Sequence, residues 1–430
     1  MTVRATDLPS QAPDVLIVGA GPAGTVAAAM LAARGIPALL VDRAAFPRSK
    51  VCGCCLSDRA IAALESVDLA ACLRDLDPPE LRRLRVFDST GVHAEFAITP
   101  GWALSRDAMD AALAREACRR GAMFLDACSA RIHADLSVSL TRGGTSTRVR
   151  TRAIIAADGI AGSSLQKVDP MAWRVSSAPR IGMSCVLDLA DGSRTIQVGP
   201  GERAPGVDGS FHGLPGAKAG AERAESRGVI RMGVLREGYA GVTDLASGLC
   251  VVAAAIRPEF VRASGGPGEA VAKVLASDEP ELARLARSAA WKGAPALTRS
   301  RESLECHVGG TSLFVAGDAA GYVEPFTGEG MSWAIDAAIA VVPFVERALI
   351  TRDVQGSTFL PGAWTAHAKR LFRLRHARCR TLSLALRSPL GVHSTLRVAS
   401  RVPRVASTLA AAFGRQPTGS RQRISTGAMA

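Results

Sequence analysis

Three glycines near the amino terminus have the spacing with which a protein backbone holds a pyrophosphate. Residues 19–24 read GAGPAG; they follow an apolar run at 14–18 and open an alanine-rich stretch at 20–34. The first glycine permits a tight turn, the second lets phosphates approach the backbone, and the third lets a helix pack closely on a strand. The free amides and the dipole at the start of that helix attract phosphate charge.

An acidic residue completes this pattern. The apolar run at 38–41 ends at Asp42, eighteen residues after the last glycine of the motif. In a strand–helix–strand unit, a carboxylate at this place accepts hydrogen bonds from the ribose of an adenosine. A glycine-rich helix start without a ligand is the alternative. The strand, the helix and the acid together favour a bound dinucleotide.

Two more acidic residues stand beside glycines after predicted strands. Asp158 follows the apolar run 153–157, and Asp318 follows the run 313–316. The Asp318 carboxylate suits the hydroxyls of a ribityl chain. The amides of residues 328–331 would lie at the start of the next helix, where they can stabilise the negative charge of a reduced flavin near N1 and the C2 carbonyl. Together, and in this order, the loops predict a flavin site.

The three motifs give the chain, up to about residue 350, a resemblance to the FAD-dependent hydroxylase and geranylgeranyl reductase superfamily, whose members share a para-hydroxybenzoate-hydroxylase-like fold. Residues 46–57 read FPRSKVCGCCLS and resemble the reductase stretch FPRxKxCGGGLS, and the Leu-Ser-Arg at 104–106 also matches. The resemblance implies that Arg106 contacts FAD and that Cys52 lies beside the isoalloxazine ring.

This chain departs from the reductase pattern at several positions. Cys54 and Cys55 stand where the reductases usually have two glycines, so the pocket differs in shape. The aromatic-Trp-aromatic-Pro signature of the reductases is missing, and its nearest counterpart is GYAG at 238–241. The WxWxIP sequence of the flavin halogenases is absent as well, so we do not expect halogenation.

We predict that Cys52 is a catalytic, flavin-adjacent thiol. We predict no metal site, because the cysteines at 52, 54 and 55 have no partner CxxC or HxxxH and Cys306-His307 is a distant pair, short of the ligands that zinc needs. The residues predicted to bind FAD are those of the motifs and their neighbours: Gly19, Gly21, Pro22, Ala23, Gly24, Asp42, Arg43, Arg106, Asp158, Gly317, Asp318, Gly328, Gly330 and Met331.

The order of the predicted elements indicates an α/β fold, in which a Rossmann-type FAD-binding domain contains an inserted antiparallel, β-rich substrate domain and is followed by a helical C-terminal region. The expected domains are a discontinuous FAD-binding domain at 1–80, 100–180 and 300–350, a substrate domain at 81–99 and 181–299, a basic helical region at 351–415 and a disordered tail at 416–430.

All of the excess positive charge lies in the C-terminal fifth of the chain. There are 52 Lys and Arg against 39 Asp and Glu, and the thirteen basic residues after Asp353 are accompanied by no acid. A solvated helical face, contact with an anionic membrane surface and contact with a nucleic acid are the three interpretations. No nucleic-acid motif or aromatic interleaving accompanies the charge, so we expect no nucleic-acid partner.

We expect a cytoplasmic protein with reduced thiols. Residues 1–13 lack the apolar segment of a secretory signal, and no apolar run reaches the roughly 18–20 residues of a membrane span. Ten cysteines in 430 residues are too few for a disulfide scaffold. Peripheral contact with the inner face of the membrane, through the basic C-terminal region, stays open.

The resemblance leads to two reactions. The first prediction is a monooxygenase that uses NADPH or NADH as a transient donor and hydroxylates a hydrophobic aromatic or polyketide-like metabolite through a flavin C4a-hydroperoxide. The alternative is a geranylgeranyl-reductase-type flavoprotein that saturates isoprenoid double bonds by hydride transfer. The stretch around Cys52 favours the reductase, whereas Cys54, Cys55 and the missing signature count against it. A flavin-binding module without turnover is a third interpretation.

Overall fold

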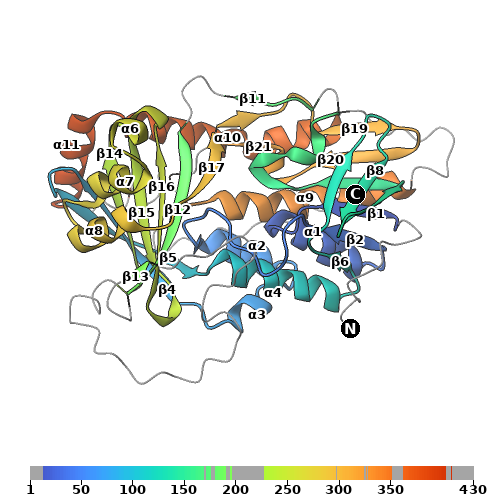
Figure 1. The fold of residues 1–430 in the computed structure, drawn as a ribbon, viewed down its shortest axis with the longest axis horizontal. Helices are drawn as coiled ribbons and strands as arrows, with labels where there is room; N and C mark the ends of the chain where they lie inside the picture. Colours follow the sequence, from blue (N-terminus) through green and yellow to red (C-terminus); the bar gives the residue numbers. More distant parts are fainter. Residues whose placement is uncertain are drawn as a thin grey trace.

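Two large sheets and the helices that cover them make up the molecule (Figure 1). The computed structural model describes residues 13–168, 171–175, 180–189, 194–195, 227–296, 298–323, 326, 328–350, 362–402 and 408. The fold class predicted from the sequence is confirmed, since a mostly parallel sheet and a mostly antiparallel sheet are present.

The first sheet has six strands in the order β19-β20-β10-β1-β2-β6. Its strands are β1 (Val15–Val18), β2 (Ala38–Val41), β6 (Met123–Leu125), β10 (Ala153–Ala156), β19 (Glu305–Val308) and β20 (Thr311–Val315). Neighbouring strands are parallel, except that β19 runs antiparallel to β20. Every residue of β1, β2 and β10 is buried, as expected for parallel strands covered on both faces.

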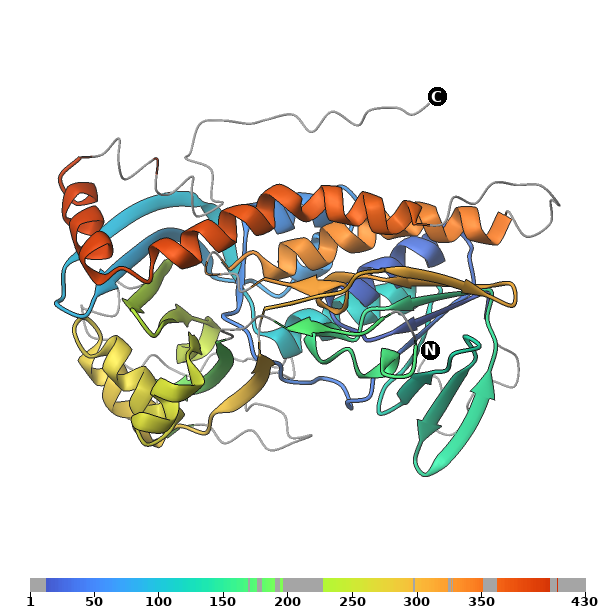
Figure 2. The same cartoon turned by 90° about the horizontal axis from the view of Figure 1, so that it is seen from above.

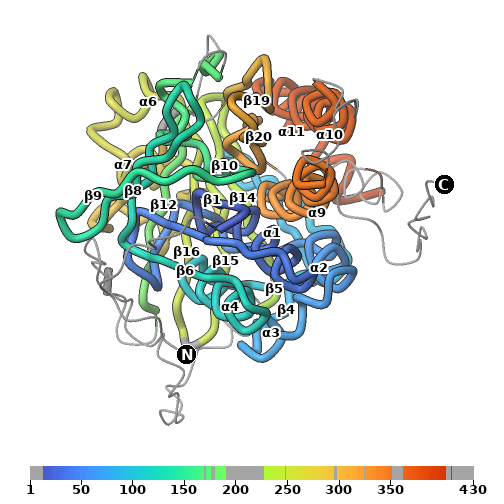
Figure 3. The backbone as a smooth tube through the Cα atoms, turned by 90° about the vertical axis from the view of Figure 1, so that its right-hand side faces the viewer, coloured from blue at the N-terminus to red at the C-terminus, as the bar shows by residue number. Residues whose placement is uncertain are grey.

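Helices cover one face of this sheet, and a small antiparallel sheet covers the other (Figure 3). The helices are α1 (Pro22–Ala33), α2 (Asp58–Glu65), α3 (Ala71–Arg74), α4 (Arg106–Arg119) and α9 (Gly330–Ile350). The small sheet consists of β7 (Ser129–Ile132), β8 (Val138–Arg142) and β9 (Thr145–Val149). This arrangement leaves the carboxyl ends of β1, β2 and β10 as the place where loops can hold a ligand.

The second sheet has the order β13-β12-β16-β15-β14-β4-β5-β3, and β17 also pairs with β12. Its strands are β3 (Cys55–Leu56), β4 (Glu80–Asp88), β5 (His93–Ala103), β12 (Ile181–Asp188), β13 (Arg194–Thr195), β14 (Val229–Leu235), β15 (Gly238–Asp244), β16 (Leu249–Ile256) and β17 (Lys292–Ala296). All pairs are antiparallel except β4 with β14. Distant parts of the chain therefore share one sheet.

Three helices follow β16, within the residues 181–299 that the sequence analysis assigned to a β-rich substrate domain. They are α6 (Pro258–Ala263), α7 (Pro267–Leu275) and α8 (Pro280–Ser288). Each begins with a proline, whose fixed φ suits the first helical position. The apolar faces of α7 and α8 pack on the nine-stranded sheet, which explains why these short helices are stable.

The C-terminal region forms two helices, α10 (Ala363–Ala385) and α11 (Pro389–Ala399). Figure 2 shows α10 along one long edge of the molecule, beside α9, and α11 at its end near the nine-stranded sheet. A three-stranded sheet of β11 (Arg174–Val175), β18 (Arg299–Ser300) and β21 (Gly321–Tyr322) joins the two halves. None of the described helices combines the length and apolarity that crossing a membrane requires.

Candidate active site

Two glycines of the first motif are required by the neighbouring backbone. Gly19 has a φ of +101°, and a Cβ there would lie 2.4 Å from the carbonyl oxygen of Ala157. A Cβ on Gly24 would lie 1.8 Å from the carbonyl oxygen of Gly19. The turn after β1 therefore needs both glycines to fold, whether or not a ligand is bound.

Gly21 differs from its neighbours, because the protein leaves room beside it. The atoms nearest to a Cβ at this position are Nη2 of Arg106 at 3.6 Å and Nη2 of Arg48 at 3.7 Å, which are ordinary contact distances. Gly21 is the N-cap of α1, and neither a capping side chain nor an acid in the first turn occupies the free amides. A helix start with two guanidinium groups beside it is a site for a phosphate-like anion.

Two buried carboxylates hold these arginines in place. Asp42 Oδ2 accepts hydrogen bonds from the amide of Ala20 at 2.9 Å and from Nε of Arg48 at 3.3 Å. Asp110 is fully buried and accepts from Nη1 of Arg48 at 2.8 Å and from Nη2 of Arg106 at 2.7 Å. Burial would lower the pKa of Arg106, but Asp110 raises it above its ordinary value, so the guanidinium stays charged.

Further charged groups line the next part of the site. Burial raises the pKa of Asp318, while Lys50 and Arg106 act against that rise. Burial also raises the pKa of Asp158, whose Oδ2 accepts a hydrogen bond from the amide of Ser164 at 2.9 Å. Oδ1 of Asp158 is buried and has no hydrogen-bond partner among the described residues. Such an oxygen is costly unless a ligand hydroxyl donates to it.

These groups surround a cavity of about 440 Å³. Gly21, Arg106 and Asp318 line one end, together with Met331 in the first turn of α9, and the nine-stranded sheet lines the other. A smaller cavity of about 70 Å³, which reaches Asp42, shares several wall residues with the first. The two cavities form an extended site along the carboxyl ends of β1, β2 and β10.

The residues predicted to bind FAD come together at these cavities. Those on the walls are Gly19, Gly21, Pro22, Ala23, Asp42, Arg43, Arg106, Asp158, Asp318, Gly328, Gly330 and Met331. Gly24 and Gly317 do not line either cavity, but their lack of a side chain lets the loops that do line them pack closely. Gly317 has a φ of +60°, and a Cβ on it would lie 2.8 Å from Cβ of Ala23. Their part in binding is therefore indirect.

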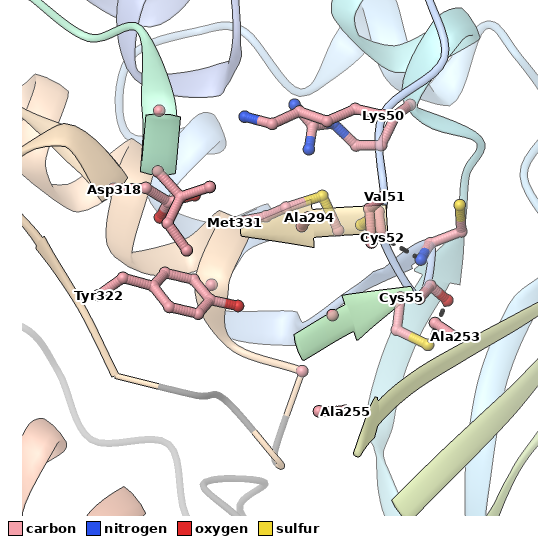
Figure 4. Close-up of a pocket in the computed structure, with 18 of the residues that line it drawn as sticks. Lys50, Val51, Cys52, Cys55, Ala253, Ala255, Ala294, Asp318, Tyr322 and Met331 are labelled. Carbon is pink, nitrogen blue, oxygen red and sulfur yellow. Dashed lines mark hydrogen bonds between the residues drawn. The ribbon is translucent and has the colours of Figure 1, made fainter. Parts of the chain in front are cut away.

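Sequence reasoning missed several polar residues of the site. The sequence analysis quoted Arg48 and Lys50 only as part of the FPRSKVCGCCLS stretch and assigned them no role, and it did not mention Asp110. The spacing of Arg106 and Asp110 is i,i+4, which is typical of an ion pair on one helix face and could have revealed the carboxylate. No signal in the sequence places Tyr322, which points into the cavity (Figure 4).

Three cysteine thiols lie where the charged end of the cavity meets the sheet (Figure 4). The amide of Cys54 donates a hydrogen bond to Sγ of Cys52 at 3.3 Å. Hydrogen bonding with Cys54 lowers the pKa of Cys52 to about 6, and the charge of Arg106 acts in the same direction against burial. Hydrogen bonding with Cys52, together with burial, raises the pKa of Cys54. Near neutral pH the pair therefore holds one proton, mainly on Cys54.

The backbone at position 54 has a conformation that suits glycine, which is the residue that the resembling reductase stretch has there. Cys54 has a φ of +57°, in the left-handed region that disfavours side chains other than glycine. This chain keeps a cysteine there at a conformational cost of about 1 kcal/mol. Cys55 Sγ lies 3.0 Å from Oγ1 of Thr243 on β15 and so ties the thiol loop to the sheet. Among the described residues, no cluster of His, Cys, Asp and Glu suits a metal ion.

The far end of the cavity is apolar. Small side chains of the nine-stranded sheet, such as Ala253, Ala255 and Ala294, leave the space open (Figure 4). Tyr239 belongs to the GYAG segment that stands nearest to the missing reductase signature, and its ring packs edge-on against Phe326 with centroids 4.7 Å apart. The segment therefore does line the cavity, although its residue types differ from those of the reductases.

The arrangement fits FAD. The amides of α1, with Arg48 and Arg106, would hold the pyrophosphate, and Asp42 lies at the smaller cavity, where an adenosine would bind. The unpaired oxygen of Asp158 offers an acceptor for cofactor hydroxyls. The start of α9 at Met331 would lie at the flavin end.

Comparison with known proteins identifies the cofactor domain. Residues 12–184 match the family model described as FAD binding domain. The chain is 37% identical to a menaquinone reductase of Mycobacterium tuberculosis over 158 residues, which are 34% of this chain and 37% of that protein. The match thus spans little more than a third of this relative's length.

Two solved structures with low sequence identity have the same fold. A flavoprotein/dehydrogenase from Cytophaga hutchinsonii is 16% identical, with a TM-score of 0.70 over 93% of this chain and 92% of its own. A geranylgeranyl bacteriochlorophyll reductase-like protein from Thermoplasma acidophilum is 18% identical, with a TM-score of 0.67 over 93% and 96%. The comparisons therefore show an FAD-binding domain at residues 12–184 and confirm the predicted fold, which this chain shares with these two proteins.

Proposed function

We propose that this protein is an FAD-dependent oxidoreductase that saturates a carbon–carbon double bond of an apolar, isoprenoid-type substrate. The observation that carries the proposal is the position of Cys52 and Cys54 on the cavity wall, where the charged and apolar ends meet, with the Cys54 amide bonded to Sγ of Cys52. Saturation requires a hydride at one carbon and a proton at the other, so an acid at this junction serves the reaction. The sequence alone favoured hydroxylation; the thiol geometry reverses that order.

The chain's own residues would move the proton. FAD supplies the hydride when it is bound. Arg106 stabilises the Cys52 thiolate, and Cys54 keeps the proton. The Cys54 thiol, next to Cys52 on the cavity wall, passes its proton to the Cys52 thiolate, and Cys52 delivers it to the substrate carbon. A proton from solvent then restores the pair, so one hydride and one proton are consumed in each turnover.

The apolar end of the cavity suits a substrate without polar groups. The cavity of about 440 Å³ would be shared by the flavin at its charged end and the substrate at its apolar end. Ala253, Ala255 and Ala294 offer smooth apolar surface and no hydrogen-bonding side chain. An isoprenoid chain gains affinity there from burial alone. The relatives named menaquinone reductase support a prenylated quinone as the first substrate to try.

The electron donor we propose is NADPH or NADH, bound transiently. The chain has one GxGxxG motif in a strand–helix context, and the cavities around it fit FAD. A nicotinamide cofactor would therefore reach the flavin from solvent and leave again rather than occupy a second Rossmann motif.

Hydroxylation stays a second candidate because of Tyr322. Its hydroxyl points into the cavity from β21 and offers a hydrogen bond to a polar group of an aromatic or polyketide-like substrate (Figure 4). An enclosed apolar wall would also protect an oxygenated flavin from water. This candidate requires oxygen, whereas reduction of a double bond does not.

The two candidates are separated by supplying reduced holoprotein with a prenylated naphthoquinone, under argon and in air. We expect a product formed under argon that keeps two added hydrogens in its prenyl chain after the quinone ring has been reoxidised in air. Cys52→Ala should lower its formation by about a hundredfold, with FAD content and flavin reduction unchanged. Cys118→Ala, on the exposed side of α4, serves as the control. A product with an added oxygen atom, formed only in air, would establish hydroxylation, and a fully active Cys52→Ala variant would remove the thiol pair from the mechanism.

A further inference from the structure

The C-terminal helices carry exposed apolar side chains among their positive charges. Nine large apolar side chains of the described residues are exposed, and five of them lie within 374–402: Leu374, Leu384, Leu390, Val398 and Val402. The same segment belongs to the region after Asp353 that contains thirteen basic residues and no acid. We propose that the outer faces of α10 and α11 dock on an anionic phospholipid bilayer.

On α10 the apolar and basic residues share one outer face. Leu374 and Leu384 are 66% and 60% exposed, and the ten-residue interval between them places them about 80° apart around the helix axis, both within its outer half. Arg370 lies one turn before Leu374 on this side, while Arg373 and Arg378 flank it on either edge. An apolar line with basic edges is the pattern of a helix that lies in the headgroup region of a membrane.

The inner face of α10 uses its charge differently. Nη1 of Arg375 forms an ion pair with Oδ2 of Asp336 on α9 at 2.6 Å, so this arginine fixes the helix to the protein. The outer arginines, Arg370, Arg373 and Arg378, are exposed and form no ion pair with any described residue. Their charge is therefore available to lipid phosphates.

The shorter helix α11 repeats this arrangement. Leu390 is 82% exposed, and Arg397 follows it after seven residues, which returns it to the same side of the helix; Arg401 is exposed just beyond the end of α11. Val398 is 47% exposed beside them. Neither arginine has an ion-pair partner in the described part of the chain. The two helices thus offer the same kind of surface in succession.

The buried faces of these helices reach the wall of the cavity. Leu386 after α10 and Val392 and Leu396 on α11 belong to the apolar cluster that contains Tyr239 and Phe326, both of which line the cavity. A bilayer on the outer face would thus be separated from the cavity by one layer of helix. This position suits delivery of a lipid-soluble substrate, which rests on the proposed function; the docking itself does not.

The exposed leucines favour a bilayer over a nucleic acid as the occupant. A polyanion without an apolar phase would neutralise the arginines but leave Leu374, Leu384 and Leu390 in water. In a bilayer, arginines contact phosphates while leucines enter the boundary between headgroups and acyl chains. Both parts of the surface are then used at once.

The test is co-sedimentation of the FAD-loaded full chain with vesicles of phosphatidylcholine alone and of phosphatidylcholine with phosphatidylglycerol. We expect binding to the anionic vesicles only. Arg370→Gln/Arg373→Gln/Arg378→Gln should lower the partition coefficient about a hundredfold, since each basic residue near the surface contributes a factor of about five. The matched control, Arg115→Gln/Arg131→Gln/Arg284→Gln, removes the same charge from exposed arginines of α4, β7 and α8 and should bind as the wild type does.

A second variant tests the apolar part. Leu374→Ser/Leu384→Ser keeps the charge and should weaken binding to anionic vesicles even at high salt, where the arginine contribution is screened. Equal binding of the two triple variants, equal binding to neutral vesicles, or absence of binding to anionic vesicles would overturn the proposal. So would a triple variant that loses affinity for a DNA duplex but keeps its affinity for vesicles. FAD content reports the fold of every variant, and none of these measurements requires turnover.

Discussion

The two ends of the cavity are built on different principles. At the charged end, buried charges fix one another: Asp110 holds Arg48 and Arg106, and Asp42 holds the glycine loop through the Ala20 amide. At the apolar end, small side chains leave a smooth wall with few directed contacts. The first end specifies a ligand by charge and geometry, whereas the second specifies volume and apolarity. Changes at the first end should therefore have larger effects.

The largest effect is expected at Asp110. Asp110→Ala removes the fully buried carboxylate between two arginines, of which Arg106 is 6% exposed, and leaves both charges without that partner. Loss of one partner from a buried ion pair costs about 3–5 kcal/mol. Urea denaturation of the FAD-loaded protein measures this loss. Glu65→Ala, which breaks the exposed pair with Arg74, should cost less than about 1 kcal/mol; a similar small loss for Asp110→Ala would contradict the network.

The next effect separates ligand binding from folding. Gly21→Asp should raise the dissociation constant of FAD at least about a hundredfold, because the new carboxylate would occupy the position of a phosphate and repel its negative charge. The apoprotein should keep its stability within about 1 kcal/mol, since a side chain at Gly21 meets only arginine tips at 3.6 Å or more.

Asp318→Ala should likewise lose flavin, because it removes a buried carboxylate from the cavity wall. The control is Gly35→Ala, which has a positive φ and open space but lies away from the cavity. Absorbance of the bound flavin after gel filtration gives the occupancy. Purified Gly21→Asp or Asp318→Ala protein that stays fully yellow would show that the site is assigned wrongly.

How far the sequence could predict these two ends follows from the same difference. Gly19, Gly24 and Asp42 could be found because each position has a local requirement that few residue types meet. The i,i+4 pair of Asp110 with Arg106 is visible in the sequence, but only the fold brings Asp110 to Arg48, and Lys50 to Asp318 and Arg106. The apolar wall comes from β12, β14, β15, β16 and β17, whose alternating apolar residues predict strands but do not reveal which face meets the cavity.

The helices α7 and α8 show why part of the fold was missed. Their apolar faces are short, and the residues that form them fall within 181–299, which the sequence analysis assigned to a β-rich substrate domain. Proline suits both a loop and the first turn of a helix, and only packing against the sheet decides between the two. Local pattern alone could not make that decision.

A smaller effect is expected at the boundary between the two ends. Cys54→Gly removes the thiol partner that lowers the pKa of Cys52 to about 6, so this pKa should rise toward the ordinary thiol value of about 8.5. In the wild type the rate of Cys52 alkylation should increase through pH 6 and level off above it. In Cys54→Gly the increase should come at higher pH. Mass spectrometry of the alkylated peptides follows it.

Cys118 provides the internal reference. The residue is exposed, but partial burial of its sulfur raises the pKa of the thiol. Its alkylation should therefore continue to increase at alkaline pH in both proteins. Glycine also relieves the left-handed backbone at position 54, so the Cys54→Gly protein should be no less stable. An unchanged alkylation profile would mean that Arg106 alone sets the Cys52 pKa.

The smallest effect is expected at Gly241, at the apolar end. A Cβ on Gly241 would meet Cγ of Met232 at 3.8 Å, an ordinary contact, and would project from a residue of the cavity wall. Gly241→Ala should therefore leave FAD binding unchanged and unfolding within about 0.5 kcal/mol. The added methyl takes space from the substrate, so KM for a long apolar substrate should rise about threefold, the equivalent of one methylene lost from contact.

Gly238, three residues earlier on β15, sharpens this test because the same change should act there on stability instead. A Cβ on Gly238 would lie 2.2 Å from the carbonyl oxygen of Ala255, so Gly238→Ala must displace the neighbouring strand. Such overpacking costs about 1–3 kcal/mol. The contradicting result is a KM that rises in Gly238→Ala but not in Gly241→Ala at matched FAD occupancy. The substrate would then not contact the face of β15 that carries Gly241, and it would not bind at the apolar end.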